Sequence, residues 1–297
     1  MAKEKKKQSK KSRAVYNVLI TICLLVFLGS AGALGYQLWD YHKAAQVRDG
    51  LADLIVEPPD EGDAAVTVDE NGDPVPKPLV DYSKLVALNP DFKGWVEIAD
   101  TPISYPVVQA ADNDEYLHTD FYGDYHKLGT VFADCRAQLT PEKTSDNVVL
   151  YGHSAADGSY FAAVRKYKDI DYYKEHPIIS FNTTYESADW IIIGEIMIDA
   201  LDDSDDAFLY NNHIEFADEA AFNEFVTGVA QRSYFVSPAD VQYGDKFITL
   251  STCDYDFDEA RFAIVARKLR PGETVDSFDI AGTQVNQNRQ MPDRWYA

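Results

Sequence analysis

The sequence predicts a mainly β domain, a sandwich or barrel with inserted helices, preceded by one transmembrane helix. An apolar stretch without charged residues lies near the amino terminus, and eight short apolar runs with turn signals between them follow later in the chain. Short runs rich in β-branched and aromatic residues at such spacing are typical of all-β sandwiches and barrels. A chain of 297 residues with 46% hydrophobic residues is long enough for one large or two small domains. The eight runs are residues 95–98, 103–108, 130–133, 148–151, 178–181, 190–197, 247–252 and 262–269.

The amino-terminal charges predict the orientation of the membrane helix. Residues 1–13 carry seven Lys or Arg and one Glu, and removing this local +6 from the formal −22 leaves −28 for the rest. Residues 14–38 contain no charge over 25 positions, which is enough to span a bilayer as a helix. Aromatic residues at Tyr36, Trp39 and Tyr41 suit the interface, and the basic tail favours a cytoplasmic amino terminus. We therefore expect a single-pass anchor at 14–38 in the cell membrane and an extracellular chain beyond it.

A cleaved secretory signal is the alternative for this stretch. Residues 31–33, Ala-Gly-Ala, offer a small-residue cleavage pattern. Apolar and aromatic residues continue past that point, which favours a retained anchor. Either outcome exports the remainder of the chain.

Residues 39–80 are predicted to be an extracellular helix and linker. Residues 41–56 continue the helical pattern, whereas 57–78 bring prolines, glycines and acids with little apolar periodicity. The acidic run that begins at Asp69 has the composition of a calcium loop, but Pro74 stands at the sixth position, where that loop needs glycine. We interpret the segment as a solvated spacer.

The folded domain is expected to occupy residues 81–270. Apolar residues spaced i, i+3, i+4, i+7 predict a helix within 218–232, and 159–168 is a shorter helical candidate. Residues 271–297 form a polar tail with Gln and Asn clustered at 284–290, for which we expect loose order.

Two strands place a thiol and a guanidinium together. The apolar run 247–252 stops at Cys253, and Arg261 begins an alternating run after the short acidic connection 254–260. A connection of that length returns one strand beside the other, so Cys253 and Arg261 should lie close at one rim of a sheet. An unpaired cysteine is often only a small buried hydrophobe, so the thiol alone does not establish chemistry.

A third reactive group also follows a strand. Residues 147–151 form an apolar run that leads directly into Gly152, His153 and Ser154. A lone histidine in such a place is more often structural than catalytic. Three reactive groups at strand ends together favour a catalytic interpretation.

The cysteines leave one structural alternative open. Cys23 lies in the predicted membrane segment, whereas Cys135 and Cys253 lie outside, where two thiols can form a disulfide. A large domain with a full core depends less on such a bridge than a small one does. We therefore favour a free Cys253 and interpret Cys135 as a buried residue at a strand end.

Several sequence blocks resemble the sortases, and within them class B. TLSTC, followed by Arg eight residues on, and NVVLYGH one hundred residues earlier carry the resemblance. Four further blocks extend it in colinear order over residues 82–270, and the resemblance implies a closed eight-stranded β-barrel with peripheral helices. These blocks are NPDFKGWVEI at 89–98, ISYPVVQ at 103–109, DNDEYLHTDF at 112–121 and GTVFAD at 129–134.

The three reactive groups match the needs of thiol-dependent amide cleavage. Such a reaction requires a thiolate nucleophile, a proton donor for the departing amine and a positive group near the carbonyl oxygen. Cys253, His153 and Arg261 supply one group for each need, because arginine stays protonated and histidine exchanges protons near neutral pH. The sortase resemblance implies the same three catalytic roles.

The resemblance also implies substrate contacts for four residues. Each has a structural interpretation as well, since leucine and tyrosine are commonly core residues, asparagine suits turns and a strand serine bonds to backbone. The four residues are Asn113, Leu117, Tyr151 and Ser251.

The resemblance implies a membrane-anchored extracellular cysteine transpeptidase. Its partners would be secreted proteins with a C-terminal sorting signal, which pass through a thioacyl-enzyme to an amine of peptidoglycan or its precursor, or to a pilin lysine. A secreted cysteine protease that uses water as the acceptor is an alternative. So is a non-enzymatic anchored binding module with a Cys135–Cys253 disulfide. The L,D-transpeptidases share the nucleophile, but their neighbouring His and Cys motif is absent from this sequence.

We expect neither a cofactor nor a metal, and no nucleic-acid partner. The remaining histidines lack metal-ligand spacing, and the chain has no glycine-rich phosphate loop. A charge of −28 beyond residue 13 would repel nucleic acid. The histidines without an assigned role are His42, His118, His126, His176 and His213.

Overall fold

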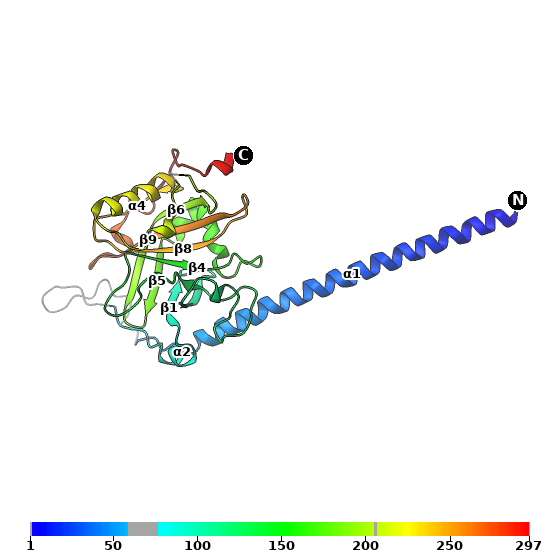
Figure 1. The fold of residues 1–297 in the computed structure, drawn as a ribbon, viewed down its shortest axis with the longest axis horizontal. Helices are drawn as coiled ribbons and strands as arrows, with labels where there is room; N and C mark the ends of the chain where they lie inside the picture. The colour runs from blue at the N-terminus through cyan, green and yellow to red at the C-terminus, as the bar shows by residue number, and fades with distance from the viewer. Residues whose placement is uncertain (1, 59–76, 205–206, 297) are drawn as a thin grey trace. The chain divides into compact units, whose positions relative to one another are not determined.

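A computed structural model of the chain describes the backbone of residues 2–58, 77–204 and 207–296, and the side chains from residue 13 onward within these ranges (Figure 1). The chain divides into two compact units, Met1–Ala52 and Asp53–Ala297. Most of the predicted spacer at 57–78, including the acidic run after Asp69, lies outside the described residues.

The first unit is one continuous helix, α1 (Ala2–Ala52). Residues 13–52 are long and apolar enough to cross a membrane, with a mean hydropathy of 2.4 in their most apolar window and none of that window buried. An uninterrupted helix with exposed apolar side chains suits a bilayer, because the side chains contact apolar lipid and the backbone polar groups form hydrogen bonds within the helix. A signal sequence has the same two properties, so α1 fits both an anchor and a signal.

The second unit is built on a closed eight-stranded barrel, as predicted. Its strands follow the order β1-β2-β3-β4-β8-β9-β6-β5, and every apolar run predicted as a strand contributes one of them. The strands are β1 (Phe92–Glu97), β2 (Ser104–Val108), β3 (Phe132–Ala133), β4 (Asn147–Tyr151), β5 (Ile178–Thr183), β6 (Ser187–Asp199), β8 (Phe247–Cys253) and β9 (Ala260–Lys268).

Two parallel pairings bring distant parts of the chain together. Strand β2 pairs with β3, and β4 pairs with β8, in parallel, whereas the other neighbours in the barrel are antiparallel. Strands β4, β8 and β9 therefore run side by side in the middle of the domain (Figure 1). Because β4 and β8 are parallel, the segments that follow their carboxyl ends leave the barrel at the same rim.

Short helices surround the barrel. The longest in this unit, α4 (Glu219–Arg232), forms where the helical pattern predicted it and begins at Asp218, whose side chain accepts from the Ala221 amide at 3.0 Å. The candidate at 159–168 is a 3-10 helix, η2 (Phe161–Lys168). The remaining helical segments are α2 (Ser83–Leu88), η1 (Glu115–Leu117), α3 (Ile170–Glu175), η3 (Tyr210–Asn212), η4 (Val275–Ser277) and η5 (Asp293–Tyr296).

Helix α4 packs closely on strand β6. Its apolar residues Phe222, Phe225 and Val229 are buried. At Gly194 the register between β6 and β9 shifts, and a Cβ atom built on this glycine would collide with Val229. The bulge and the missing side chain together let the helix approach the strand. This contact closes the hydrophobic core on one side of the barrel.

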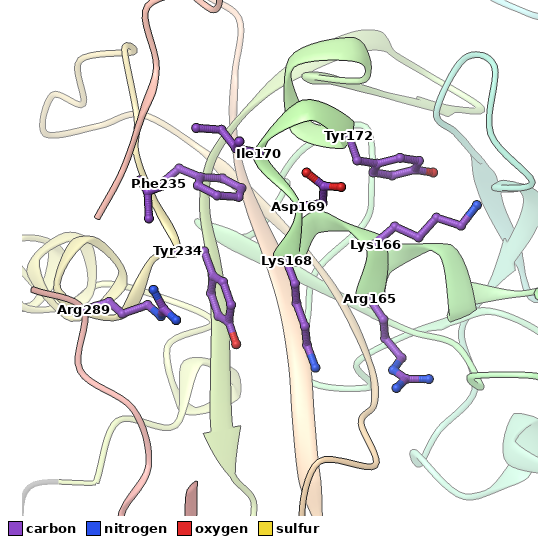
Figure 2. A pocket seen from close by; sticks show the side chains of 10 residues that line it. Arg165, Lys166, Lys168, Asp169, Ile170, Tyr172, Tyr234, Phe235 and Arg289 are labelled. Carbon is purple, nitrogen blue, oxygen red and sulfur yellow. The ribbon is translucent and has the colours of Figure 1, made fainter. Parts of the chain in front are cut away.

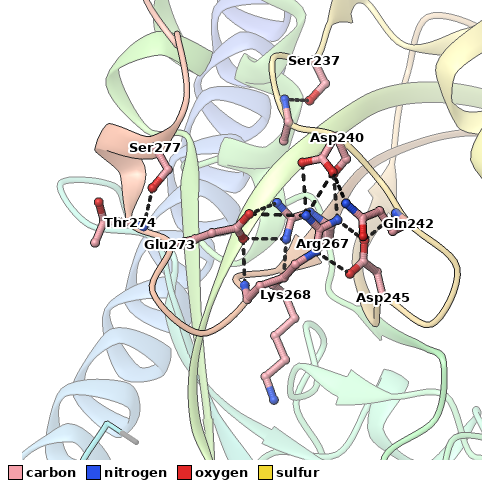
Figure 3. A network of polar contacts seen from close by, with 11 residues as sticks. Ser237, Asp240, Gln242, Asp245, Arg267, Lys268, Glu273, Thr274 and Ser277 are labelled. Atoms are coloured by element: carbon pink, nitrogen blue, oxygen red, sulfur yellow. Dashed lines mark hydrogen bonds and ion pairs between the residues drawn. The ribbon is translucent and has the colours of Figure 1, made fainter. Parts of the chain in front are cut away.

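An ion-pair network around the buried Arg267 lies at the end of β9 (Figure 3). The Arg267 side chain is fully buried and donates to the carboxylate of Glu273 at 2.8 and 3.2 Å. Arg270 reaches Asp240 at 3.0 Å and Asp245 at 2.7 Å. A buried guanidinium needs such partners because unpaired burial of charge is costly. The network joins the segment after β9 to the segment that precedes β8.

Part of the polar tail pairs with the rest of the domain, which differs from the expectation of loose order. Strand β10 (Gln284–Val285) pairs antiparallel with β7 (Phe235–Val236). Just beyond β10, the Asn286 amide donates to the Tyr234 carbonyl at 2.8 Å, and its side chain donates to the Ser233 carbonyl at 3.0 Å. A polar composition does not prevent order here, because backbone pairing supplies what apolar burial does not.

Candidate active site

Strands β8 and β9 bring the predicted nucleophile and cation into register. Cys253 is the last residue of β8 and Arg261 the second residue of β9, and the two are directly paired across the antiparallel ladder. The short connection between the two strands therefore brings Cys253 and Arg261 together, as the sequence predicted. The thiol and the guanidinium come from neighbouring strand ends at one rim of the barrel.

The parallel pairing of β4 and β8 carries His153 to the same rim. Tyr151 at the end of β4 pairs with Ser251, and the Gly152 amide donates to the Ser251 carbonyl at 3.1 Å. Thr252 then donates its hydroxyl to the Gly152 carbonyl at 2.7 Å. A Cβ on Gly152 would lie 2.6 Å from the Phe161 ring, so glycine is needed where the chain turns toward His153.

All seven predicted site residues line one cavity of about 210 Å³. The residues come from separate parts of the sequence and meet because the barrel closes. The cavity also includes Thr130, Phe132, Gly152 and Thr252. The predicted residues that line it are Cys253, His153, Arg261, Asn113, Leu117, Tyr151 and Ser251.

The His153 ring is held by a backbone carbonyl and a second imidazole. Its Nε2 lies 3.0 Å from the Leu117 carbonyl oxygen, and the ring stacks on His118 with centroids 5.9 Å apart. Since a carbonyl only accepts, Nε2 carries the proton and the neutral ring keeps Nδ1 as its basic nitrogen. Burial lowers the pKa of His153, opposed in part by the bond to Leu117. At neutral pH the imidazole is therefore uncharged in the free enzyme.

Arg261 is a fixed positive charge beside the thiol. Its guanidinium donates to Glu259 at 2.8 Å and to the Ala260 carbonyl at 3.1 Å. Burial works to lower the pKa of Arg261, but the interactions with Cys253 and Glu259 raise it further above its ordinary value. The side chain is 30% exposed, so part of the group remains open to the cavity. It can stabilise negative charge but cannot act as a base.

The four residues predicted to contact substrate also have partners within the protein. The Tyr151 hydroxyl donates to Asp134 at 2.9 Å, and Asn113 Oδ1 accepts from the Cys135 amide at 2.8 Å. These bonds fix the side chains, and they leave the amide group of Asn113 as a potential donor to a ligand. The site thus combines preset orientation with unused hydrogen-bonding capacity.

Sequence reasoning missed Tyr210. Its buried hydroxyl forms a short hydrogen bond of 2.5 Å with Ser251 Oγ, and burial raises the pKa of Tyr210 to about 12. Cys253 and Arg261 are close enough to influence that pKa in opposite directions. The residue comes from η3, outside any strand, and the sequence around it offers no signal that would have identified it.

Two further residues lie close to the predicted site without being predicted to belong to it. His118 was left without a role, but its ring stacks on His153. Asp254 directly follows Cys253, and its carboxylate pairs with Arg165 at 3.1 Å and Lys168 at 2.8 Å. The acid therefore acts in an ion-pair cluster, outside the residues that line the cavity.

The cysteines are not bridged. Cys135 and Cys253 are both free, and both are partly exposed. The structure therefore does not contain the disulfide on which the binding-module alternative depends, and Cys135 is less buried than its predicted strand-end position suggested. Within the described residues, no group of three or more His, Cys, Asp or Glu side chains is arranged to hold a metal ion.

Comparisons with known proteins agree on one family. No protein-family model matches the chain. Sortase B of Listeria monocytogenes is 35% identical over 248 residues, which cover 83% of this chain and 93% of the relative. A structure of the Staphylococcus aureus sortase B–substrate complex has a TM-score of 0.57 and 27% identity, covering 63% of this chain and 84% of that one. A structure of sortase B complexed with triglycine has a TM-score of 0.57 and 26% identity, covering 64% of this chain and 85% of that one.

The identity to the Listeria relative and the closed barrel, with a thiol, an imidazole and a guanidinium at one cavity, lead to one assignment. The chain belongs to the sortase B family of cysteine transpeptidases.

Proposed function

We propose that this protein is a membrane-anchored extracellular transpeptidase that attaches secreted proteins to an amine of the cell surface. The substrates carry a C-terminal sorting motif, and the acceptor is an amine of peptidoglycan or its precursor, or a pilin lysine. The observation that carries the proposal is the convergence of Cys253, His153 and Arg261 on one cavity. Two related structures, a substrate complex and a triglycine complex, support binding of both an acyl donor and an amine.

In the first half of the reaction, the thiol becomes acylated. The neutral His153 ring takes the proton of the Cys253 thiol, and the thiolate attacks the carbonyl carbon of the scissile amide. Arg261 stabilises the negative charge that forms on the carbonyl oxygen. When the carbon–nitrogen bond breaks, the imidazolium returns its proton to the departing amine. The products of this half are a thioacyl-enzyme and a neutral imidazole.

In the second half, an amine replaces the thiol. The incoming amine attacks the thioester carbon and gives a proton to His153, while Arg261 again stabilises the oxyanion. The carbon–sulfur bond then breaks, the proton returns to the sulfur, and the starting enzyme is restored. Transfer instead of hydrolysis requires the amine to react before water, which a narrow cavity favours.

The cavity accommodates only part of a sorting motif. A volume of about 210 Å³ is below the range of about 300–1,000 Å³ that is usual for complete ligand sites. We therefore infer that it takes the residues next to the scissile bond. Asn113 and Ser251 would bind substrate backbone, while Leu117 and Tyr151 would contact side chains.

The amino-terminal helix serves as the anchor in this proposal. The helix α1 is long and apolar enough to span a bilayer, and the basic residues before the span favour an inside amino terminus. This orientation leaves the barrel outside the cell, where sorting signals and cell-wall amines are available. Detection of uncleaved chain in isolated membranes, accessible to protease only from the outside, would test the orientation.

Transfer and hydrolysis are separated by one comparison. The purified chain is incubated with a fluorogenic sorting-motif peptide, with and without added triglycine, and the products are resolved by mass spectrometry. A ligated product that depends on Cys253 supports the transpeptidase, with Cys253→Ala as the inactive control. Hydrolysis alone at saturating amine would support the cysteine protease instead.

A further inference from the structure

A second cavity of about 730 Å³ lies on the surface beside η2 and is lined by cationic side chains. It shares no lining residue with the cavity that contains Cys253. Four cationic side chains line it in a chain whose net charge is −22. Figure 2 shows them around two tyrosine rings. These six residues are Arg165, Lys166, Lys168, Arg289, Tyr172 and Tyr234.

Two of the four cations are already neutralised by acids. Arg165 and Lys168 both pair with Asp254, at 3.1 and 2.8 Å, and Lys168 also pairs with Asp256 at 2.6 Å. These pairs offset the positive charge of Arg165 and Lys168. The charge available to a ligand must come from the other two cations.

Lys166 and Arg289 have no carboxylate partner among the described residues. The Lys166 amine lies 5.3 Å from the centre of the Tyr172 ring, and the Arg289 guanidinium lies 4.5 Å from the centre of the Tyr234 ring. The Nε atom of Arg289 is buried without a hydrogen-bond partner. A partly buried guanidinium with an unused N–H donor can form a charge-assisted hydrogen bond to an anion.

The hydroxyl of Tyr234 is a second unused donor. The residue is 6% exposed, and its hydroxyl oxygen is buried without a hydrogen-bond partner. Figure 2 shows its ring extending into the cavity, with the Arg289 guanidinium on one side and the Lys168 side chain on the other. Buried hydroxyls are nearly always paired, so this exception calls for an explanation. A bound acceptor would satisfy both this hydroxyl and Arg289.

We propose that this cavity binds the phosphate group of an organic phosphate. A phosphate offers several strong acceptor oxygens in different directions, which matches donors from a guanidinium, an ammonium and a phenol. The one acid that lines the cavity, Asp169, is occupied as the cap of α3, where it accepts from the Asp171 amide at 3.0 Å. Ile170, Phe235 and Val285 supply apolar surface for the attached organic group. The volume falls within the usual range for ligand sites, about 300–1,000 Å³.

The test uses the full chain in a nonionic detergent and two phosphate probes. Inorganic pyrophosphate, titrated by calorimetry, represents a soluble phosphate, and micelles doped with phosphatidic acid represent a lipid headgroup. We expect saturable one-to-one binding that Arg289→Gln weakens about tenfold or more, as loss of a charge-assisted hydrogen bond implies. The control Arg294→Gln, an arginine of the same tail segment outside the cavity, should leave binding unchanged.

Tyr234→Phe separates ligand binding from a structural role. Because its hydroxyl has no hydrogen-bond partner among the residues that the structure describes, removal should not lower the melting temperature of the unliganded chain. The same variant should bind the phosphate probe several-fold more weakly. A lower melting temperature with unchanged binding would instead show that the hydroxyl serves the fold and would remove it from the site.

The two probes identify the source of the phosphate. Binding of pyrophosphate that depends on Arg289 indicates a soluble ligand, and dependence on Arg289 only with phosphatidic acid indicates a lipid. Peptide ligation to triglycine should be unchanged in Arg289→Gln, since the two cavities are separate. The proposal is overturned when neither probe binds, or when both bind wild type and Arg289→Gln equally.

Discussion

Glu195 lies in the middle of β6 and is almost completely buried. Its side chain is 2% exposed and lies 2.9 Å from Ser233 Oγ, which in turn lies 2.8 Å from the Phe235 carbonyl oxygen. A serine has one proton, and if it donates that proton to the carbonyl, a protonated Glu195 can donate to the serine. Burial raises the pKa of Glu195 from 4.5 to about 8, so the protonated form is the native one at neutral pH.

The raised pKa makes stability depend on pH with a defined sign. A folded pKa above the unfolded value means that the native state holds its proton more tightly. The resulting stabilisation is complete below about pH 4.5 and is lost as the pH rises through about 8. At about 1.4 kcal/mol for each pH unit, the ceiling of the effect is about 5 kcal/mol. Between pH 5 and pH 7 the loss should be roughly 2–3 kcal/mol.

Glu195→Gln removes the titration and keeps the shape. We expect the free energy of unfolding of the variant, relative to wild type, to rise by roughly 2–3 kcal/mol from pH 5 to pH 7. The measurement is guanidinium unfolding of the full chain in nonionic detergent, followed by the fluorescence of the buried Trp95 and Trp190. Glu175→Gln, at a side chain that is 72% exposed, is the control. Parallel pH curves for wild type and Glu195→Gln would refute the reasoning.

Two substitutions and one pH profile test the site and the core. Arg261→Gln should lower kcat/KM for peptide ligation by about 10²–10³, because the oxyanion loses its cation, and activity equal to wild type would exclude that role. Burial lowers the pKa of His153 below 6.5. The acid limb of the pH profile of kcat/KM should therefore have its midpoint below pH 6.5, and a midpoint above pH 6.5 would contradict this role of His153. Phe225→Ala opens a cavity under α4 and should cost about 3–5 kcal/mol of unfolding free energy by denaturant titration, whereas a loss below about 1 kcal/mol would contradict the packing described above.

Local patterns were enough to locate the strands but not to order them. Each barrel strand has its own apolar run, and the Cys253–Arg261 contact follows from a short connection between adjacent strands. The neighbours of β4 could not be predicted from the residues alone, because its pairing with β8 joins segments about one hundred residues apart. The sequence resemblance supplied that information, since it implied the whole barrel.

The parts of the site that lay beyond prediction come from loops. Tyr210 reaches Ser251 from a short 3-10 turn whose position depends on how the chain crosses the barrel. The pairing of β10 with β7 was missed for a similar reason, because its backbone bonds leave no trace in composition. Periodicity identifies elements that bury an apolar face, whereas isolated tertiary contacts have no periodic signature.

Under the proposed mechanism, the parallel pairing of β4 with β8 also sets when the chain can become reactive. His153 is made one hundred residues before Cys253, and the two meet only after the intervening segment has closed into a loop. Contacts of such long range form slowly, because the entropy of loop closure must be overcome first. A chain that has been synthesised only as far as β6 contains His153 but neither Cys253 nor Arg261. Under the proposed mechanism, chains that have not been synthesised through β9 therefore lack the complete set of reactive groups.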